Sequence, residues 1–192
     1  MKRDSDATKA RLLDAAIAEF AVFGIEAARL DRIAAQAQAN KQLIYRYFGD
    51  KRALFDAVIR KTMTELAEAI EVTPDDIPGY LEAMRNYHTA HPHVLRLLMW
   101  EALEQGHADV LAQPERQQHY THKTERFRAA QEKGLIRSDI GPEYLTLMLL
   151  GLALWPQVVP QLNQLITGEE PGSDRLLAST VALARQMLEP PR

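Results

Sequence analysis

The chain has 192 residues, enough for one large domain or for a small domain followed by a larger one. It contains no cysteine, which excludes disulfide bonds and thiolate metal ligands, and its formal net charge is −3. This charge argues against a protein that coats nucleic acid, but residues 1–61 hold 12 Lys and Arg against 8 Asp and Glu, whereas the remainder holds 11 against 18. A basic N-terminal segment on an acidic body would direct a polyanion to that segment.

Neither a signal peptide nor a transmembrane helix is predicted. The first residues include Lys2 and Arg3, but no apolar segment follows them. The most apolar stretch, residues 144–154, is too short to cross a bilayer. We therefore expect a cytoplasmic protein without a membrane partner.

Helical periodicity runs through the chain, and no long stretch alternates with period two, so the predicted fold class is all-α. The predicted helices cover residues 8–23, 30–37, 41–47, 51–70, 78–90, 93–105, 114–133, 142–155, 156–167 and 174–188. Gly24 is expected to end the first helix in a left-handed conformation. Asn40 and Asp50 are expected to be the N-caps of the third and fourth helices.

The second and third predicted helices form a hairpin with a tight turn at Gln38-Ala39. When a first helix supports such a pair, the second helix of the hairpin can enter a major groove of DNA. Lys41 and Arg46 are suited to guanine acceptors, and Gln42 is suited to an adenine edge. Three further side chains are suited to phosphate oxygens: Tyr45, Tyr47 and Lys51. Ordinary helical bundles also contain short hairpins with tyrosines, so the hairpin alone leaves DNA binding open.

The stretch IAAQAQANKQLIYRYFGDKRALF, residues 33–55, resembles the TetR-type (tetracycline-repressor-like) helix-turn-helix. That family's pattern is Ile-Ala, a Gly turn, a small capping residue and then Tyr-x-x-Phe-x-x-Lys-x-x-Leu. The matching residues are Ile33, Ala34, Asn40, Tyr45, Phe48, Lys51 and Leu54. The resemblance is specific over about residues 8–60 and architectural beyond them.

This resemblance implies a three-helix DNA-binding domain at residues 6–66 and a larger helical bundle for dimerisation and ligand binding at residues 67–192. It also implies a sequence-specific transcriptional regulator. The protein would be a homodimeric repressor that binds a palindromic operator of double-stranded DNA, is released by a small-molecule effector and needs no cofactor. The helix-turn-helix would extend from Arg29 to Phe48. The implied DNA-contacting residues are Arg29, Asn40, Lys41, Gln42, Leu43, Tyr45, Arg46, Tyr47 and Lys51.

Two positions depart from the family pattern. Gln38 stands where a turn glycine is usual, so either the turn relaxes or Gln38 accepts a strained positive φ. Arg29 replaces the usual Thr before the second helix, which removes a hydroxyl cap and adds a positive charge. Both changes bear on the angle of the reading helix.

The body of the chain carries apolar stripes and a candidate ligand cavity. The stripes could face the core of the monomer or, as the resemblance favours, a second subunit. One helix carries Leu145, Met148, Leu149 and Leu152, and another carries Leu176, Leu177, Val181, Ala184 and Leu188. An effector cavity is expected among apolar, aromatic and a few polar side chains: Met84, His88, Leu97, Trp100, Glu101, Tyr120, Phe127, Met148 and Trp155.

Two other functions compete with DNA binding. A metal-dependent hydrolase would need a convergent catalytic set, yet no Ser-His-Asp, HExxH or Gly-rich phosphate motif is present, so we expect no enzyme. The spacing of His119 and His122, and of the histidines around Pro92, could hold a metal, but solvated or capping roles are more common and no metal site is predicted. A scaffold with a degenerate DNA-binding head is favoured only by Gln38, and the basic reading face argues against it.

Overall fold

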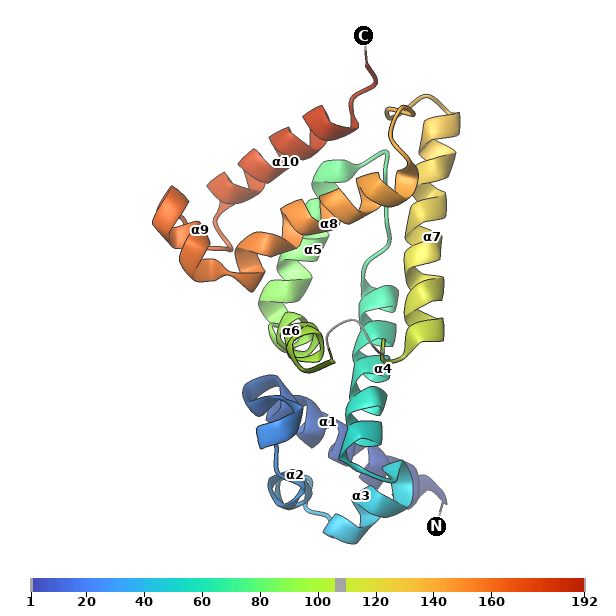
Figure 1. The fold of residues 1–192 in the computed structure, drawn as a ribbon, viewed down its shortest axis with the longest axis vertical. Helices are drawn as coiled ribbons and strands as arrows, with labels where there is room; N and C mark the ends of the chain where they lie inside the picture. Colours follow the sequence, from blue (N-terminus) through green and yellow to red (C-terminus); the bar gives the residue numbers. More distant parts are fainter. Residues whose placement is uncertain (1, 106–109, 192) are drawn as a thin grey trace. The chain divides into compact units, whose positions relative to one another are not determined.

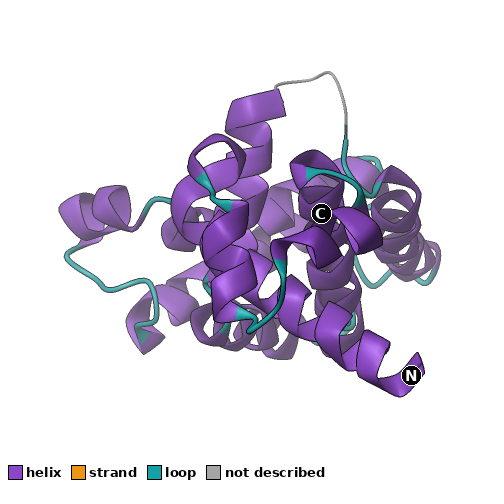
Figure 2. Cartoon of the chain, turned by 90° about the horizontal axis from the view of Figure 1, so that it is seen from below, coloured by secondary structure: helices purple, strands orange, loops and turns teal. Residues whose placement is uncertain are grey.

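The computed structural model describes residues 2–105 and 110–191, and within these ranges the chain is helical without a strand (Figure 2). This confirms the predicted all-α fold class for the described residues. The helices, labelled as in Figure 1, are α1 (Lys2–Ala27), α2 (Leu30–Gln36), α3 (Lys41–Phe48), α4 (Lys51–Ala69), α5 (Ile77–Ala90), α6 (His93–Gln105), α7 (Gln113–Glu132), α8 (Pro142–Val158), α9 (Pro160–Thr167) and α10 (Asp174–Leu188).

Both predicted N-caps are confirmed. The side-chain oxygen of Asn40 accepts a hydrogen bond from the backbone N–H of Gln42 at 2.8 Å. The carboxylate of Asp50 accepts one from the backbone N–H of Ala53 at 2.7 Å. Each bond satisfies a backbone donor that the first turn of a helix leaves without a partner, so these residues fix where α3 and α4 begin.

Gly24 does not act as the predicted left-handed cap. Its φ of 69° and ψ of −176° lie in a region that glycine alone enters readily, and the helix resumes after this kink and reaches Ala27. Glycine is also required by space, because a Cβ at this position would lie 2.7 Å from Oε1 of Glu104 and 2.8 Å from the ring of Trp100. The kink therefore lets α6 approach α1 closely.

Pro156 was predicted to begin a helix but lies inside α8, which continues to Val158. Pro160 instead occupies the first turn of α9, where a proline lacks only a donor that would have no helical partner. Among residues 2–105 and 110–191 no single helix is long and apolar enough to cross a membrane; α8 and α9 reach that length and composition only as a pair bent by 89°.

The chain divides into two units. Unit 1 consists of Met1–Glu65 and Pro92–Glu115, and unit 2 consists of Leu66–His91 and Arg116–Arg192. The division falls close to the predicted boundary at residues 66 and 67, but α6 joins unit 1, where it packs along α1. A helix expected in the C-terminal bundle therefore supports the N-terminal helices.

The core of unit 1 joins α1 to the helix-turn-helix. Phe20 of α1 and Phe55 of α4 are completely buried and meet edge to face, with ring centroids 5.1 Å apart. Ile33 of α2 and Ile44 of α3 are also completely buried. Burying one such side chain contributes about 1.5–3 kcal/mol, so these residues fix α2 and α3 on α1 and α4.

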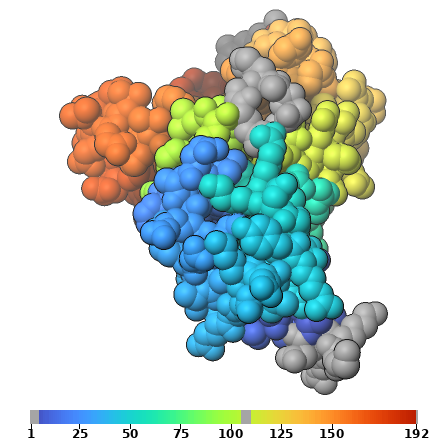
Figure 3. Space-filling view, turned by 60° about the horizontal axis from the view of Figure 1, so that its bottom comes forward, coloured from blue at the N-terminus to red at the C-terminus, as the bar shows by residue number. Residues whose placement is uncertain are grey.

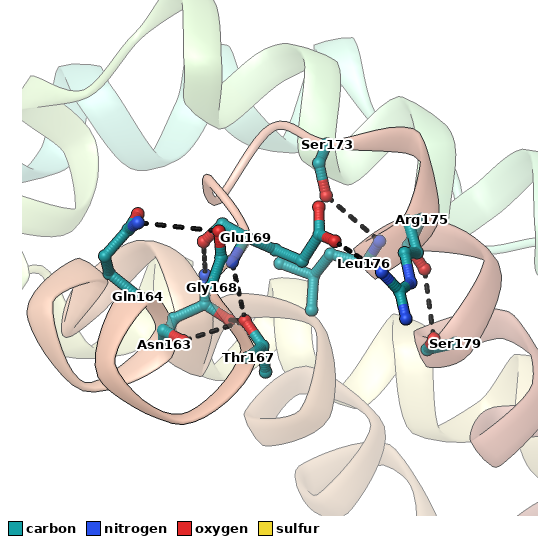
Figure 4. A network of polar contacts seen from close by, with 9 residues as sticks. All are labelled: Asn163, Gln164, Thr167, Gly168, Glu169, Ser173, Arg175, Leu176 and Ser179. Carbon is teal, nitrogen blue, oxygen red and sulfur yellow. Dashed lines mark hydrogen bonds and ion pairs between the residues drawn. The ribbon is translucent and has the colours of Figure 1, made fainter.

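The core of unit 2 is formed by α5, α7, α8 and α10, with Leu81, Phe127, Leu145 and Leu149 at most 2% exposed. α9 stands outside this core and is tied to the start of α10 by polar contacts (Figure 4). Asn163 donates from Nδ2 to the carbonyl oxygen of Glu169 at 2.6 Å. The connection between α9 and α10 is therefore an ordered part of the fold.

Candidate nucleic-acid interface

The turn between α2 and α3 takes the strained conformation that the sequence left open. Gln38 has a φ of 50°, in the left-handed region that favours glycine. The backbone N–H of Ala39 bonds to the carbonyl oxygen of Ala34 at 2.9 Å, which closes the turn after α2. Gln38 thus accepts the steric cost of a non-glycine residue, and the turn keeps the tight geometry expected of a helix-turn-helix.

Helix α1 holds both ends of α2. At the N-terminal end the carboxylate of Glu19, only 5% exposed, accepts the backbone N–H of Arg29 at 2.7 Å and Nε of Arg32 at 2.8 Å. Burial by itself would raise the pKa of Glu19, but these hydrogen bonds outweigh it and hold the pKa below its usual value. At the other end, Nε of Arg11 donates to the carbonyl oxygen of Ala37 at 3.2 Å.

Glu19 explains how α2 begins without the usual hydroxyl cap. Arg29 occupies the N-cap position and its side chain makes no capping hydrogen bond. The buried carboxylate satisfies the backbone donor from a neighbouring helix instead. The sequence signal for Glu19 was a charged residue on the face of α1 that carries Ala16 and Phe20, both completely buried.

Helix α3 turns one face to the core and another to solvent. Ile44 is completely buried, whereas Gln42, Tyr45 and Arg46 are exposed, with Tyr45 49% exposed. The side chains of these three exposed residues make no hydrogen bond or ion pair with another described residue. Figure 3 shows the light-blue segment that contains α2 and α3 at the surface of unit 1.

Other predicted DNA-contacting side chains of this surface already have partners within unit 1. Lys41 pairs with Asp31 of α2, with Nζ 3.1 Å from Oδ1, and the Tyr47 hydroxyl lies 3.0 Å from Oγ of Ser5. Nζ of Lys51 donates to the carbonyl oxygens of Glu26, at 2.9 Å, and Ala28, at 3.4 Å. Lys51 therefore ties the start of α4 to the C-terminal end of α1.

Six of the nine predicted DNA-contacting residues lie on α3. The other three lie at the starts of helices: Arg29 precedes α2, Asn40 precedes α3, and Lys51 is the first residue of α4. Leu43 is half-buried, and Arg29 and Asn40 are exposed. Two of these residues also have structural roles: Asn40 is the predicted cap of α3, and Lys51 is a link to α1 that was not predicted. Contact of any of the nine with DNA stays a prediction.

The nine predicted cavity residues do not lie in one unit. Leu97, Trp100 and Glu101 belong to unit 1. Trp100 donates from Nε1 to the carbonyl oxygen of Ala21 at 3.4 Å, and the carboxylate of Glu101 accepts the backbone N–H of Leu111 at 2.9 Å. These contacts belong to the packing of unit 1 itself.

In unit 2 the remaining six separate into two groups. Met84, His88 and Phe127 are at most 3% exposed, and Tyr120 is half-buried. Met148 and Trp155 are 55% and 56% exposed on α8, so the structure does not bring them together with Met84 and Phe127 in the core. A helix that is apolar on several faces offers no periodicity from which these orientations could be predicted.

Unit 2 also contains a buried lysine that sequence reasoning missed, and two buried histidine nitrogens. Lys123 of α7 is 5% exposed and donates from Nζ to the hydroxyl of Tyr80 of α5 at 3.3 Å. Nδ1 of His88 and Nε2 of His119 are buried and have no hydrogen-bond partner among the residues that the structure describes. Burial lowers the pKa of each histidine to about 4, with further contributions from the positive charge of Lys123, so both are neutral at pH 7.

The spacing of His119, Lys123 and Phe127 was the available signal, because residues four apart share one face of a helix. The pair considered from the sequence was His119 and His122, but His122 is exposed. A lysine within a charged helix gives no sequence signal of burial, since lysines are rarely fully buried.

Comparison with known proteins agrees with this architecture. Residues 12–58 match the model of the bacterial regulatory proteins of the tetR family, and residues 76–186 match the tetracyclin repressor-like C-terminal domain. The HTH-type transcriptional repressor SCO4008 of Streptomyces coelicolor is 47% identical over 188 residues, which cover 97% of this chain and 98% of that protein. The HTH-type transcriptional repressor NicS of Pseudomonas putida is 29% identical, with 78% and 76% covered.

A solved structure shares the whole fold. The crystal structure of SCO4942 from Streptomyces coelicolor has a TM-score of 0.82 and 31% identity, and the match covers 96% of this chain and 99% of that chain. The family models fall on the helix-turn-helix and on the helical body that follows it. The chain therefore belongs to the TetR family of bacterial regulatory proteins and is a DNA-binding transcriptional regulator.

Proposed function

We propose that this protein is a homodimeric repressor that reads a palindromic operator with α3 and is released from it by a small-molecule effector. The observation that carries the proposal is the exposed face of α3. The side chains of Gln42, Tyr45 and Arg46 are exposed there and have no partner among the described residues, and Asn40 caps the start of the helix. SCO4008 and NicS, which are similar over most of the chain, are named repressors. Such a protein acts on chromosomal DNA in the cytoplasm.

The nine residues divide into two roles. Lys41, Gln42, Leu43 and Arg46 meet base edges or a thymine methyl group, since basic and amide side chains match the acceptors and donors of guanine and adenine. The others, Arg29, Asn40, Tyr45, Tyr47 and Lys51, position the protein on phosphates, which adds affinity without sequence preference. Two donor hydrogens of Lys51 bond to carbonyl oxygens of unit 1, which leaves one for a phosphate.

The dimer contact is proposed on exposed faces of α8 and α10, which share only Met148 with the predicted stripes. Leu145, Leu149, Ala184 and Leu188 are at most 3% exposed, so these four members of the predicted stripes lie in the monomer's own core. The exposed stripe of α8 and its neighbour on α10 contain Tyr144, Leu147, Met148, Trp155 and Leu183, each 53–63% exposed. Exposed apolar side chains in such a row are typical of a surface that a partner covers.

Gly151 lies between Met148 and Trp155 on α8 and is itself exposed, with open space where a Cβ would stand. A glycine in the middle of an exposed apolar stripe lets the backbone of a partner helix approach closely. Two helices from each subunit would then form an intermolecular four-helix bundle. In a dimer, two reading helices about 34 Å apart contact successive half-sites.

The test starts with selection of bound fragments from a random duplex pool, followed by titration of the selected sequence by fluorescence anisotropy at several salt concentrations. We expect an inverted repeat, bound far more tightly than scrambled DNA and weakened steeply by salt because phosphate contacts release counterions. Absence of enrichment together with absence of binding at low salt would refute the proposal.

Variants separate the two roles. Arg46→Ala should relax the preference at one position of each half-site and cost about 1–3 kcal/mol of binding free energy, whereas Lys51→Ala should weaken all sequences alike. Arg128→Ala is the matched control, because Arg128 is an exposed arginine on α7 of unit 2 and pairs there with Glu125. It should leave both affinity and preference unchanged.

A further inference from the structure

Helices α5 and α7 of unit 2 meet at Lys123 and Tyr80, and each helix carries a row of side chains through that contact. Tyr80, Met84 and His88 follow one face of α5 at intervals of four residues, and each is at most 3% exposed. His119, Lys123 and Phe127 follow one face of α7 at the same interval. The two helices run in opposite directions (Figure 1), and Lys123 meets Tyr80 both through its hydrogen bond and with Nζ 5.3 Å from the ring centroid.

Lys123 is a buried cation without a counter-ion. None of the Asp and Glu residues that the structure describes lies within ion-pair distance of Nζ, which makes one hydrogen bond, to the hydroxyl of Tyr80. An ammonium group has three donors, so two stay unused. Burial lowers the pKa of Lys123 to about 8, and most molecules therefore still carry the charge at pH 7. A buried charge is costly unless a group of opposite charge pairs with it.

The neighbouring histidines add unsatisfied polar atoms of the same kind. Nδ1 of His88 and Nε2 of His119 are buried without a partner in the described part of the chain, and each neutral ring has one N–H donor and one acceptor nitrogen. His119 precedes Lys123 by one turn on the same face of α7, and His88 follows Tyr80, the partner of Lys123, by two turns on α5. Buried polar atoms in native proteins nearly always have a partner, so several orphans around one cation point to a missing group.

Beside these polar atoms the same two helix faces continue as apolar surface. Met84 and Phe127 belong to the core cluster of unit 2, and Phe127 is 1% exposed. Methionine is unbranched and adaptable, and it lines many sites that accept varied apolar ligands. Because the helices run in opposite directions, Phe127 and Met84 lie on opposite sides of the Lys123–Tyr80 pair, so apolar side chains flank the buried charge.

We infer that the effector of this regulator is an amphipathic organic acid whose carboxylate pairs with Lys123 and accepts hydrogen bonds from Tyr80 or the neutral histidines, while its hydrocarbon part contacts Met84 and Phe127. This inference rests on the proposed function, since it assigns the ligand class of the effector site. A carboxylate supplies negative charge and acceptor oxygens at one point, which is what the orphaned groups lack. A cationic ligand would add a second positive charge beside Lys123.

The test uses the full chain and three pairs of probes that differ only in charge: benzoate and benzamide, phenylacetate and phenylacetamide, and octanoate and octanamide. Calorimetric titration and thermal unfolding are measured for each. Because a hydrogen-bonded charge contributes about 1.5–3 kcal/mol, we expect at least one carboxylate to bind about 10- to 100-fold more tightly than its amide. That carboxylate should also release the selected operator.

Lys123→Met removes the charge and keeps a long apolar side chain, so the variant is expected to fold at least as stably as the parent. It should bind the active carboxylate about 10- to 100-fold more weakly, whereas the exposed control Lys133→Met should bind it like the parent. If Lys123→Met does not fold, the side-chain nitrogen resonances of His88 and His119 in the parent give the answer. They should shift on titration with the carboxylate and not with the amide.

The inference is overturned if an amide binds as tightly as its acid, if Lys123→Met keeps full affinity, or if no carboxylate raises the unfolding temperature at ~10 mM. Operator binding is measured on the same preparations. Retained operator binding without carboxylate binding rejects the ligand class alone, whereas loss of operator binding in the parent rejects the proposed function.

Discussion

Replacement of Glu19 by alanine should destabilise the helix-turn-helix from its first turn. The change removes the acceptor of the Arg29 backbone N–H, which is 2.7 Å away, and the partner of Arg32. A hydrogen bond to a charged group contributes about 1.5–3 kcal/mol when one partner is buried. The ion pair itself adds little, because the Arg32 side chain is 43% exposed and solvent screens it. We expect Glu19→Ala to lower the free energy of unfolding by about 2 kcal/mol.

The assay is urea unfolding followed by circular dichroism, with anisotropy titration of the selected operator on the same samples. Glu19→Gln is the matched control: it keeps an amide oxygen for the Arg29 N–H and removes only the charge, so it should lose about half as much stability, ~1 kcal/mol. The pKa of Glu19 is lowered in the folded state. The extra stability of the charged form is therefore present above the unfolded value of about 4.5 and disappears as pH falls through the folded value.

Two results would refute the reasoning. If Glu19→Ala unfolds within ~0.5 kcal/mol of the parent, the carboxylate does not stabilise the start of α2. If Glu19→Gln lowers the free energy of unfolding as much as Glu19→Ala does at pH 7, the charge of Glu19 rather than its capping geometry stabilises α2. Operator affinity should fall in Glu19→Ala even at temperatures where the protein remains folded, because the base-reading helix follows directly from α2 through the turn at Gln38.

Three further outcomes are expected. Gln38→Gly should raise the free energy of unfolding by about 0.5–1 kcal/mol, because removing the strain of a positive φ outweighs the greater chain entropy of glycine. The midpoint of urea unfolding measures this change, and Gln38→Val should shift the midpoint in the opposite direction. The folded-state pKa values of about 4 for His88 and His119 lie below 6.5, so protons bind preferentially to the unfolded chain and thermal stability should decrease as pH falls from 6.5 to 4. Trp155→Glu should give a folded monomer by sedimentation velocity, whereas Val22→Glu, an equally exposed site in unit 1, should leave the parent's dimer intact; an unchanged Trp155→Glu dimer would contradict the proposed interface.

The starts of α3, α4 and α8 could be predicted from local chemistry. Asn40 and Asp50 are capping residues with a specific acceptor geometry, and proline marks first turns, so the sequence contains the signals that decide where α3, α4 and α8 begin. The prediction from local chemistry was wrong at Gly24. A glycine after an amphipathic helix usually caps it, but here a neighbouring helix occupies the space beside it and the chain kinks instead.

Which face of an apolar helix meets which partner could not be predicted. Helix α8 carries apolar residues on several faces, so Leu145 and Leu149 in the core and Leu147 and Met148 at the surface give the same pattern in the sequence. The burial of Lys123 could not be predicted either, because a lysine in a charged helix is usually exposed to water. Such assignments depend on tertiary packing, which periodicity does not encode.

Helix α6 shows how that packing supports the reading surface. Nε of Arg96 donates to the carbonyl oxygen of Ala21 at 2.7 Å, and Glu104 accepts the backbone N–H of Ile25 at 2.8 Å, so α6 satisfies backbone groups on both sides of the kink at Gly24. The same α1 supplies Glu19 to the start of α2. A segment that follows α5 in the chain thus fixes the helix on which the helix-turn-helix is built. An effector that binds α5 shifts the DNA-binding equilibrium by its differential affinity for the two states, and a change passed through α6 to α1 would supply such a difference.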